Sequence, residues 1–238
     1  MTSKLERADE LLRQNKFEEV EAILSSMPNS PDVGWRKARL AYVSTTAKPR
    51  KPSKDTLKEI YKKALSDVQE GYQGKQPNAE CLIWEGICKS EYAELVGPNE
   101  RIKIAYEIRD LWDRALQMEP KNGWAIGCVG IWCFNVTDLS DVKRSFAKAF
   151  FTKPPDSTYQ EALDNLLKAE ALLDDPRPNL LIIIAKCYYR MKDWDNVRRY
   201  CTKVMNLPDL GYEVAEVGFL SGITKLNVLF YWQLLGQG

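Results

Sequence analysis

Side chains that commonly carry acid–base or metal chemistry are scarce in this sequence. Its 238 residues include no histidine, which removes Ser-His-Asp and Cys-His catalysis and imidazole-bound zinc or copper. The six cysteines form no C-x-x-C pair, and we interpret them as reduced, mostly buried side chains. We find no glycine-rich phosphate loop and no paired carboxylates in an apolar context. We therefore expect no enzyme, no metal site and no cofactor.

A basic segment between residues 48 and 63 is the clearest candidate binding site. It holds seven basic residues against two acidic ones, in a chain whose formal net charge is only +1. The basic residues are Lys48, Arg50, Lys51, Lys54, Lys58, Lys62 and Lys63. A proline-containing loop with this charge would attract an acidic, disordered partner by screened attraction, and a solvated face without a partner is the alternative. Because the whole chain is nearly neutral, we expect no nucleic-acid partner.

Aromatic and apolar residues in two further segments are candidates for lining a concave groove that holds an acyl chain or a peptide. They are Trp124, Cys128, Trp132, Phe146, Phe150 and Phe151. Packing between helices would explain the first three equally well. The last three belong to a basic amphipathic insert, which suits a membrane interface or the rim of a groove. A helix folded back onto the core is the alternative for this insert.

Helices must position these residues, because the pattern along the chain is helical almost throughout. Twelve prolines divide the chain into windows long enough for one or two helices. Within most windows, apolar residues recur at the 3.6-residue period among Ala, Leu, Glu and Lys. Since the alternation typical of strands is scarce, the sequence predicts an all-α protein.

The clearest repeat covers residues 178–208, where Leu181, Ala185, Tyr188 and Pro208 follow the tetratricopeptide pattern with conservative replacements. Small residues in this pattern let two antiparallel helices approach closely. Weaker matches upstream predict five hairpins, at about 4–28, 33–70, 80–120, 123–176 with an insert at 137–156, and 178–208. Each hairpin buries its apolar face only against its neighbours, so we predict a single right-handed superhelical solenoid over residues 1–238.

The last segment, residues 209–238, is unusually apolar. From Gly218 to Leu235 the only charged residue is Lys225, and this length approaches the roughly 20 residues that span a bilayer. Because a lysine at that depth would be costly, we expect a helix that caps the solenoid or fills its groove. Membrane insertion is the alternative. The charged N-terminal residues predict neither a signal peptide nor an anchor, and hence synthesis in the cytosol.

Several runs resemble the regulator of microtubule dynamics family. They are GIWCF at 130–134, KPPDSTYQEALDNLLKAEALL at 153–173 and AYEIRDLWDRALQMEPKNGWAIGCVGIWC at 105–133. The resemblance covers roughly residues 33–208. It implies a tetratricopeptide-like adaptor that associates with microtubules and spindle poles. A membrane-anchored member of the family acts as an organelle tether that binds phospholipid, which implies a second possible role.

We therefore predict a non-enzymatic interaction scaffold on the cytoplasmic cytoskeleton, at the spindle and spindle poles, that contributes to microtubule dynamics and chromosome segregation. The basic segment would meet the acidic tails of tubulin, and the concave groove would hold partner proteins. The alternative is a phospholipid-binding or transfer module at organelle contact sites, with peripheral membrane contact and an apolar groove between repeats. A carboxylate clamp for peptide ends is not evident, because Glu85 and Glu91 would make the surface of the first helices mixed in charge.

Overall fold

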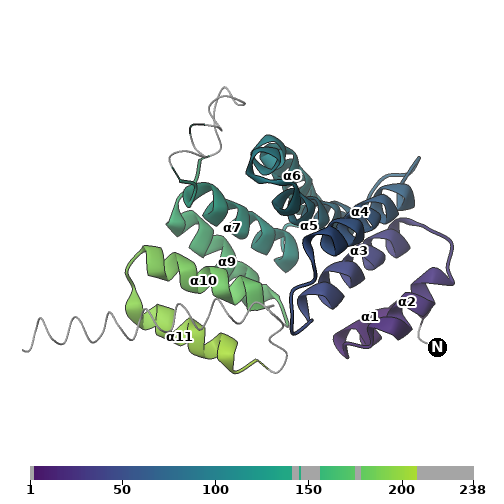
Figure 1. The fold of residues 1–238 in the computed structure, drawn as a ribbon, viewed down its shortest axis with the longest axis horizontal. Helices are drawn as coiled ribbons and strands as arrows, with labels where there is room; N and C mark the ends of the chain where they lie inside the picture. Colours follow the sequence, from purple (N-terminus) through teal and green to yellow (C-terminus); the bar gives the residue numbers. More distant parts are fainter. Residues whose placement is uncertain (1–2, 141–144, 146–155, 175–177, 208–238) are drawn as a thin grey trace, which may run out of the picture.

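A computed structural model describes residues 3–140, 145, 156–174 and 178–207, and this part of the chain is helical without strands (Figure 1). The predicted all-α class is confirmed. The helices are α1 (Lys4–Arg13), α2 (Phe17–Ser25), α3 (Pro31–Thr46), α4 (Lys54–Gly71), α5 (Ala79–Val96), α6 (Pro98–Met118), α7 (Gly123–Thr137), α9 (Tyr159–Leu172), α10 (Pro178–Arg190) and α11 (Trp194–Met205). The capping helix expected at 209–238 and most of the insert expected at 137–156 lie outside the described residues.

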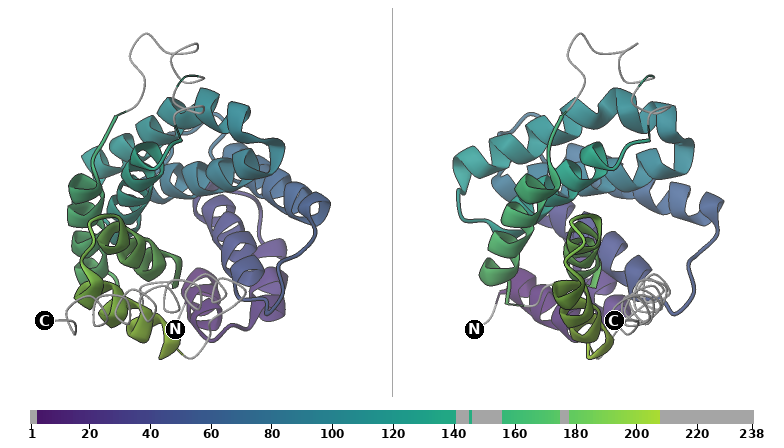
Figure 2. Two further views of the ribbon diagram at one scale, coloured as in Figure 1. Left: turned by 60° about the vertical axis from the view of Figure 1, so that its left-hand side comes forward. Right: turned by 90° about the vertical axis from the view of Figure 1, so that its left-hand side faces the viewer.

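The helices pack in chain order as hairpins: α1 with α2, α3 with α4, α5 with α6, α7 with α9, and α10 with α11. First helices of successive pairs also touch, since α3 contacts α5, α5 contacts α7, and α7 contacts α10. Each pair therefore buries its apolar face against its neighbours, as in a helical solenoid. The array curves into an arc with α1 and α2 at one end and α10 and α11 at the other (Figure 2).

Side chains at the helix starts explain why the chain turns where it does. Ser30, Ser53, Asn78, Asn122 and Thr158 precede α3, α4, α5, α7 and α9, and each accepts a hydrogen bond from a backbone N–H of the first turn. Such caps satisfy donors that have no partner within the helix. The hairpin boundaries are thus encoded locally, before any tertiary packing.

Small residues occupy the eighth helical position in the first helix of four pairs: Ala38, Gly86, Gly130 and Ala185. All four are buried. A Cβ atom added to Gly86 would lie 2.4 Å from Nε1 of Trp112 in α6, so the two helices of this pair cross at a point that admits no side chain. Glycine is required here by close approach and not by an unusual backbone angle.

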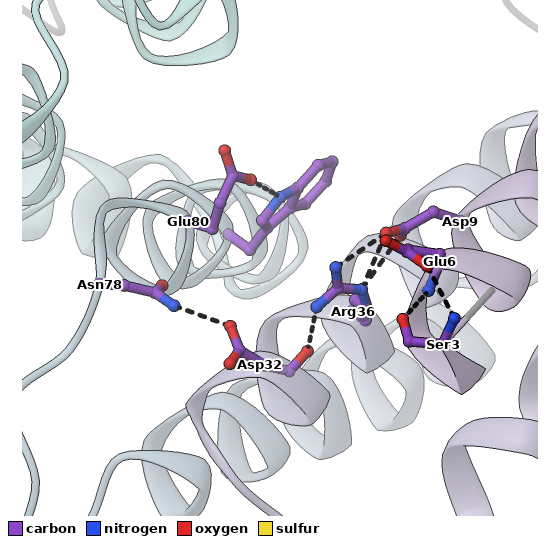
Figure 3. A network of polar contacts seen from close by, with 8 residues as sticks. Ser3, Glu6, Asp9, Asp32, Arg36, Asn78 and Glu80 are labelled. Atoms are coloured by element: carbon purple, nitrogen blue, oxygen red, sulfur yellow. Dashed lines mark hydrogen bonds and ion pairs between the residues drawn. The ribbon is translucent and has the colours of Figure 1, made fainter. Parts of the chain in front are cut away.

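A guanidinium group ties the first pair to the second. Arg36 of α3 donates from Nε and Nη2 to the carboxylate of Asp9 in α1 at 2.8–3.1 Å (Figure 3). Both side chains are largely buried, with 15% and 21% of their surface exposed. The two-pronged geometry fixes direction as well as distance, so this contact sets how α1 sits on α3.

Two asparagine side chains link successive hairpins further along the array, and we call these contacts the asparagine ladder. Asn78, the cap of α5, donates from Nδ2 to Asp32 of α3 at 3.1 Å (Figure 3). Asn122, the cap of α7, donates in the same way to Glu80 of α5 at 2.9 Å. Asp32 and Glu80 are both the second residue of their helix. Each rung therefore links the start of one first helix to the start of the preceding first helix.

Candidate functional site: a basic edge and an inner pocket

The basic segment spans the loop between α3 and α4 and the first three turns of α4, and we call its seven basic residues, named above, the basic edge. Lys48, Arg50 and Lys51 are exposed on the loop. Lys54 is the first residue of α4, and Lys58 and Lys62 follow at intervals of four, so these three share a helix face. The cations of the loop adjoin this face at Lys54, because the loop runs directly into α4.

Lys63 and Lys58 of the basic edge have acidic neighbours. Lys63 donates to Asp67 at 2.9 Å, and Asp67 also lies 3.5 Å from Lys37 of α3. The Asp67 side chain is only 16% exposed, so Lys63 belongs in part to the contact between α3 and α4. Lys58 lies 3.7 Å from the exposed Asp55, a surface pair worth at most about 1 kcal/mol. The loop and the first turn of α4 therefore carry the charge best placed for a partner.

The first helices of four successive pairs meet around a small cavity, which we call the inner pocket. Its apolar lining includes Tyr42 of α3, Ile87 of α5, Trp124 and Cys128 of α7, and Leu180 of α10. As the described residues form it, the pocket has a volume of about 70 Å³. Small-molecule sites commonly have roughly 300 to 1,000 Å³, so these residues alone do not enclose an acyl chain.

Two aromatic rings that line the inner pocket, Tyr42 and Trp124, both pack against the fully buried Trp84. The ring centroids of Tyr42 and Trp84 are 6.1 Å apart, and those of Trp84 and Trp124 are 5.0 Å apart. The guanidinium carbon of Arg39 lies 5.9 Å from the Trp84 centroid and 6.0 Å from that of Trp124. Tilted ring pairs with a cation nearby are attractive arrangements, so these rings join the first helices α3, α5 and α7.

The structure separates the groove residues expected from the sequence. Trp124 and Cys128 line the inner pocket. Trp132 instead donates from Nε1 to the backbone oxygen of Ala105 at 2.9 Å, with Arg109 over its ring at 5.0 Å. It therefore joins α7 to α6. The remaining candidates, Phe146, Phe150 and Phe151, lie outside the described residues.

Glu85 and Glu91 do not share one surface, contrary to the expectation from the sequence. Glu91 lines the inner pocket. Glu85 is 6% exposed and accepts hydrogen bonds from Nε2 of Gln69 at 2.9 Å and from the hydroxyl of Tyr72 at 2.6 Å. Glu85 therefore faces α4. Burial, and then the bond to Glu85, raises the pKa of Tyr72 well above its ordinary value of 10.

The cysteine in the inner pocket acts as apolar surface. All six cysteines are buried and have free thiols, and burial raises the pKa of Cys128 far above its ordinary value. A thiol held in this neutral form is a weak nucleophile and a weak ligand. Within the described ranges, no cluster of three His, Cys, Asp or Glu residues is placed to hold a metal ion. In the same ranges, no helix combines the length and apolarity needed to cross a membrane.

The described residues form five stacked hairpins with a basic edge and a small inner pocket, which places the chain among the helical-hairpin solenoid proteins. A family model described as regulator of microtubule dynamics protein 1-3 matches residues 4–218. The chain belongs to this family, and the resemblance noted in the sequence is confirmed.

Relatives with curated names agree with this assignment. Regulator of microtubule dynamics protein 1 of Mus musculus is 28% identical over 191 residues, covering 79% of this chain and 62% of the relative. The protein of the same name from Bos taurus is 27% identical over 206 residues, covering 86% and 64%. Regulator of microtubule dynamics protein 3 of Xenopus laevis is 30% identical over 183 residues, covering 76% and 39%. The matched region thus spans less than two thirds of each of these relatives.

Proposed function

We propose that this chain is a non-enzymatic scaffold that associates with microtubules through its basic edge. The observation that carries the proposal is the cluster of exposed cations on the loop between α3 and α4 and the first turn of α4. The relatives are named regulators of microtubule dynamics, which supports the microtubule as the partner. The proposed role is to contribute to microtubule dynamics and chromosome segregation, on the cytoplasmic cytoskeleton at the spindle and spindle poles.

The acidic, disordered tails of tubulin are the part of the microtubule that the basic edge suits best. Flexible charged chains bind by long-range attraction and do not require a shaped pocket. The loop of the basic edge suits such a chain, because residues 47–53 lie outside any helix and the cations of the loop are exposed. Its charge is concentrated within a few residues, so several cations lie within one screening length of the same tail, about 8 Å at physiological salt.

Charge reversal tests the proposal directly. Replacing Arg50, Lys51 and Lys54 by Glu should abolish cosedimentation with microtubules and leave the circular dichroism spectrum unchanged, because these exposed residues support little of the core. The matched control replaces three exposed cations elsewhere, Lys75, Lys121 and Lys168, by Glu. This control makes the same change in net charge and should bind like the parent protein.

Two further measurements separate Coulombic contact from other modes of binding. The parent's binding should weaken steeply as ionic strength rises from about 0.05 to 0.2 M, because the screening length falls from about 14 to about 7 Å. Removing the tubulin tails with protease should have the same effect as the triple reversal. If the triple-reversal protein pellets with intact microtubules at the parent's affinity, the basic edge is not the contact and the proposal fails.

A second candidate function uses the inner pocket, which could hold a partner peptide or part of a phospholipid. Its lining by Trp124, Cys128, Ile87 and Leu180 favours an apolar occupant. Mass spectrometry of small molecules extracted from natively purified protein tests this function. A stoichiometric phospholipid would support it, whereas clean protein that pellets with microtubules would support the scaffold.

A further inference from the structure

Three hydroxyl residues of the chain have a basic residue three positions earlier. They are Ser53 after Arg50, Ser66 after Lys63, and Thr202 after Arg199. Basophilic protein kinases select serine or threonine by this charge pattern. The sequence alone does not rank the three residues, but the structure does.

Backbone conformation separates Ser53 from the other two. A kinase reads the residues before its target as an extended chain, which a regular helix does not present. Ser66 lies within α4 and donates to Glu70 at 2.5 Å, and Thr202 lies within α11. Ser53 is exposed, has extended backbone angles (φ −60° and ψ 154°), and follows the non-helical residues 47–52.

We propose that Ser53 is a phosphorylation site and that its modification weakens the basic edge. The proposed effect on binding rests on the proposed function above, whereas the modification itself does not. Ser53 lies between Lys51 and Lys54, so a phosphate there would stand among the cations most exposed to a partner. Ser66 and Thr202 lie within helices. Of the three residues, Ser53 is therefore the one that combines an extended backbone with a position in the basic segment.

The local contacts of Ser53 permit the reaction. Its Oγ accepts a hydrogen bond from the backbone N–H of Thr56 at 3.2 Å and lies 2.7 Å from Oγ1 of Thr56. A cap of this kind contributes about 1 kcal/mol, so the first turn can open without unfolding α4. Phosphorylating Ser66 or Thr202 would instead require several turns of a packed helix to unwind.

The chemistry is phosphoryl transfer from ATP by a basophilic kinase. The Ser53 oxygen forms a bond to the γ-phosphorus, and the bond from that phosphorus to the β,γ-bridging oxygen breaks. ADP leaves, and the hydroxyl proton passes to the base of the kinase. The phosphate adds about −1.5 to −2 charges, which lowers the local excess of five positive charges to roughly three. At the start of α4 it also faces unpaired N–H groups, so the helix should persist.

Phosphosite mapping on the native 238-residue chain tests the modification. The probe is the catalytic subunit of the cyclic-AMP-dependent kinase with ATP. Mass spectrometry should find phosphate on Ser53 and little on Ser66 or Thr202, and the Ser53→Ala variant should lose that signal. If the native chain is phosphorylated on Thr202 or Ser66 but not on Ser53, the inference is overturned.

Cosedimentation of the phosphorylated protein then tests the consequence. Binding should weaken roughly three- to tenfold at low salt because fewer net charges face the tails, while kinase-treated Ser53→Ala protein binds unchanged. If phosphorylated protein binds like the parent although the triple reversal abolishes binding, the proposed effect of phosphorylation on binding is wrong. The proposed role of the basic edge in microtubule binding is then unaffected. If the triple reversal also binds like the parent, the proposed function itself is wrong, whatever the phosphosite map shows.

Discussion

Replacing Gly86 by Ala tests whether the crossing of α5 and α6 has room for one methyl group. The new Cβ would lie 2.4 Å from Nε1 and 2.9 Å from Cε2 of Trp112. The indole is 4% exposed and donates from Nε1 to the backbone oxygen of Ile83 at 3.3 Å. It therefore cannot swing away without losing this bond, and the helices must move apart.

The magnitude follows from two opposing effects. Overpacking of a buried site costs about 1 to 3 kcal/mol, whereas replacing a helical glycine by alanine gains about 1 kcal/mol. Gly127→Ala is the matched control, because it makes the same gain in α7 and its Cβ would meet the flexible end of a side chain, Cδ1 of Leu180 at 2.9 Å, and then Cβ of Ala169 at 3.4 Å. The two variants should therefore differ by about 1 to 3 kcal/mol, with Gly86→Ala the less stable.

Thermal unfolding followed by circular dichroism at 222 nm measures this difference. For a chain of this size, 1 kcal/mol shifts Tm by about 2 to 4 °C, so Gly86→Ala should melt roughly 2 to 12 °C below Gly127→Ala. A Tm of Gly86→Ala equal to or above that of the control would refute the close crossing and the packing that depends on it.

Three further predictions concern other contacts. Ala185→Phe, at a site that is 1% exposed, should overpack a crossing and cost about 1 to 3 kcal/mol, and an unchanged Tm would contradict this. Asn122→Ala removes the cap of α7 and the hydrogen bond to Glu80, and it should lower the free energy of unfolding in urea by about 1 to 2 kcal/mol. Asn122→Asp keeps the cap but places its carboxylate beside that of Glu80, so it should not recover the full stability. Burial and the hydrogen bond to Asp138 raise the pKa of Tyr159 to about 12. Because the folded state keeps this proton longer, stability should be complete below pH 10 and fall between about pH 10 and 12, and Tyr159→Phe should flatten that fall in urea midpoints.

The helical class and the order of packing could be predicted because they follow from residues that lie close together in the sequence. Prolines, capping residues and the 3.6-residue period all act within one or two turns. The exact crossing points depend on both partners and were harder to place. In the pair of α5 and α6, the close approach occurs at Gly86, against Trp112 of the partner helix, and the pattern of a single helix does not specify that partner.

The inner pocket was predicted only in part, because its lining comes from several hairpins and the sequence pattern does not place these hairpins relative to one another. Trp124 and Cys128 were expected to line a groove, whereas Tyr42 of α3 and Leu180 of α10 belong to other hairpins and reach the pocket only when the hairpins stack. The direction of Glu85 could not be predicted for a similar reason. Its partners, Gln69 and Tyr72, belong to the end of the preceding hairpin, and a periodic pattern does not say which neighbour a buried carboxylate meets.

The asparagine ladder makes the array tolerant of changes in repeat number. Its two rungs use the same geometry, an asparagine cap above a carboxylate at the second helical position of the preceding first helix. If the hairpin of α5 and α6 were lost as a unit, Asn122 would come to stand over Asp32, and an equivalent rung could form. Duplication of that hairpin would likewise add a rung of Asn78 over Glu80. The asparagine ladder would thus preserve the junction between neighbouring hairpins when a hairpin is gained or lost in the gene.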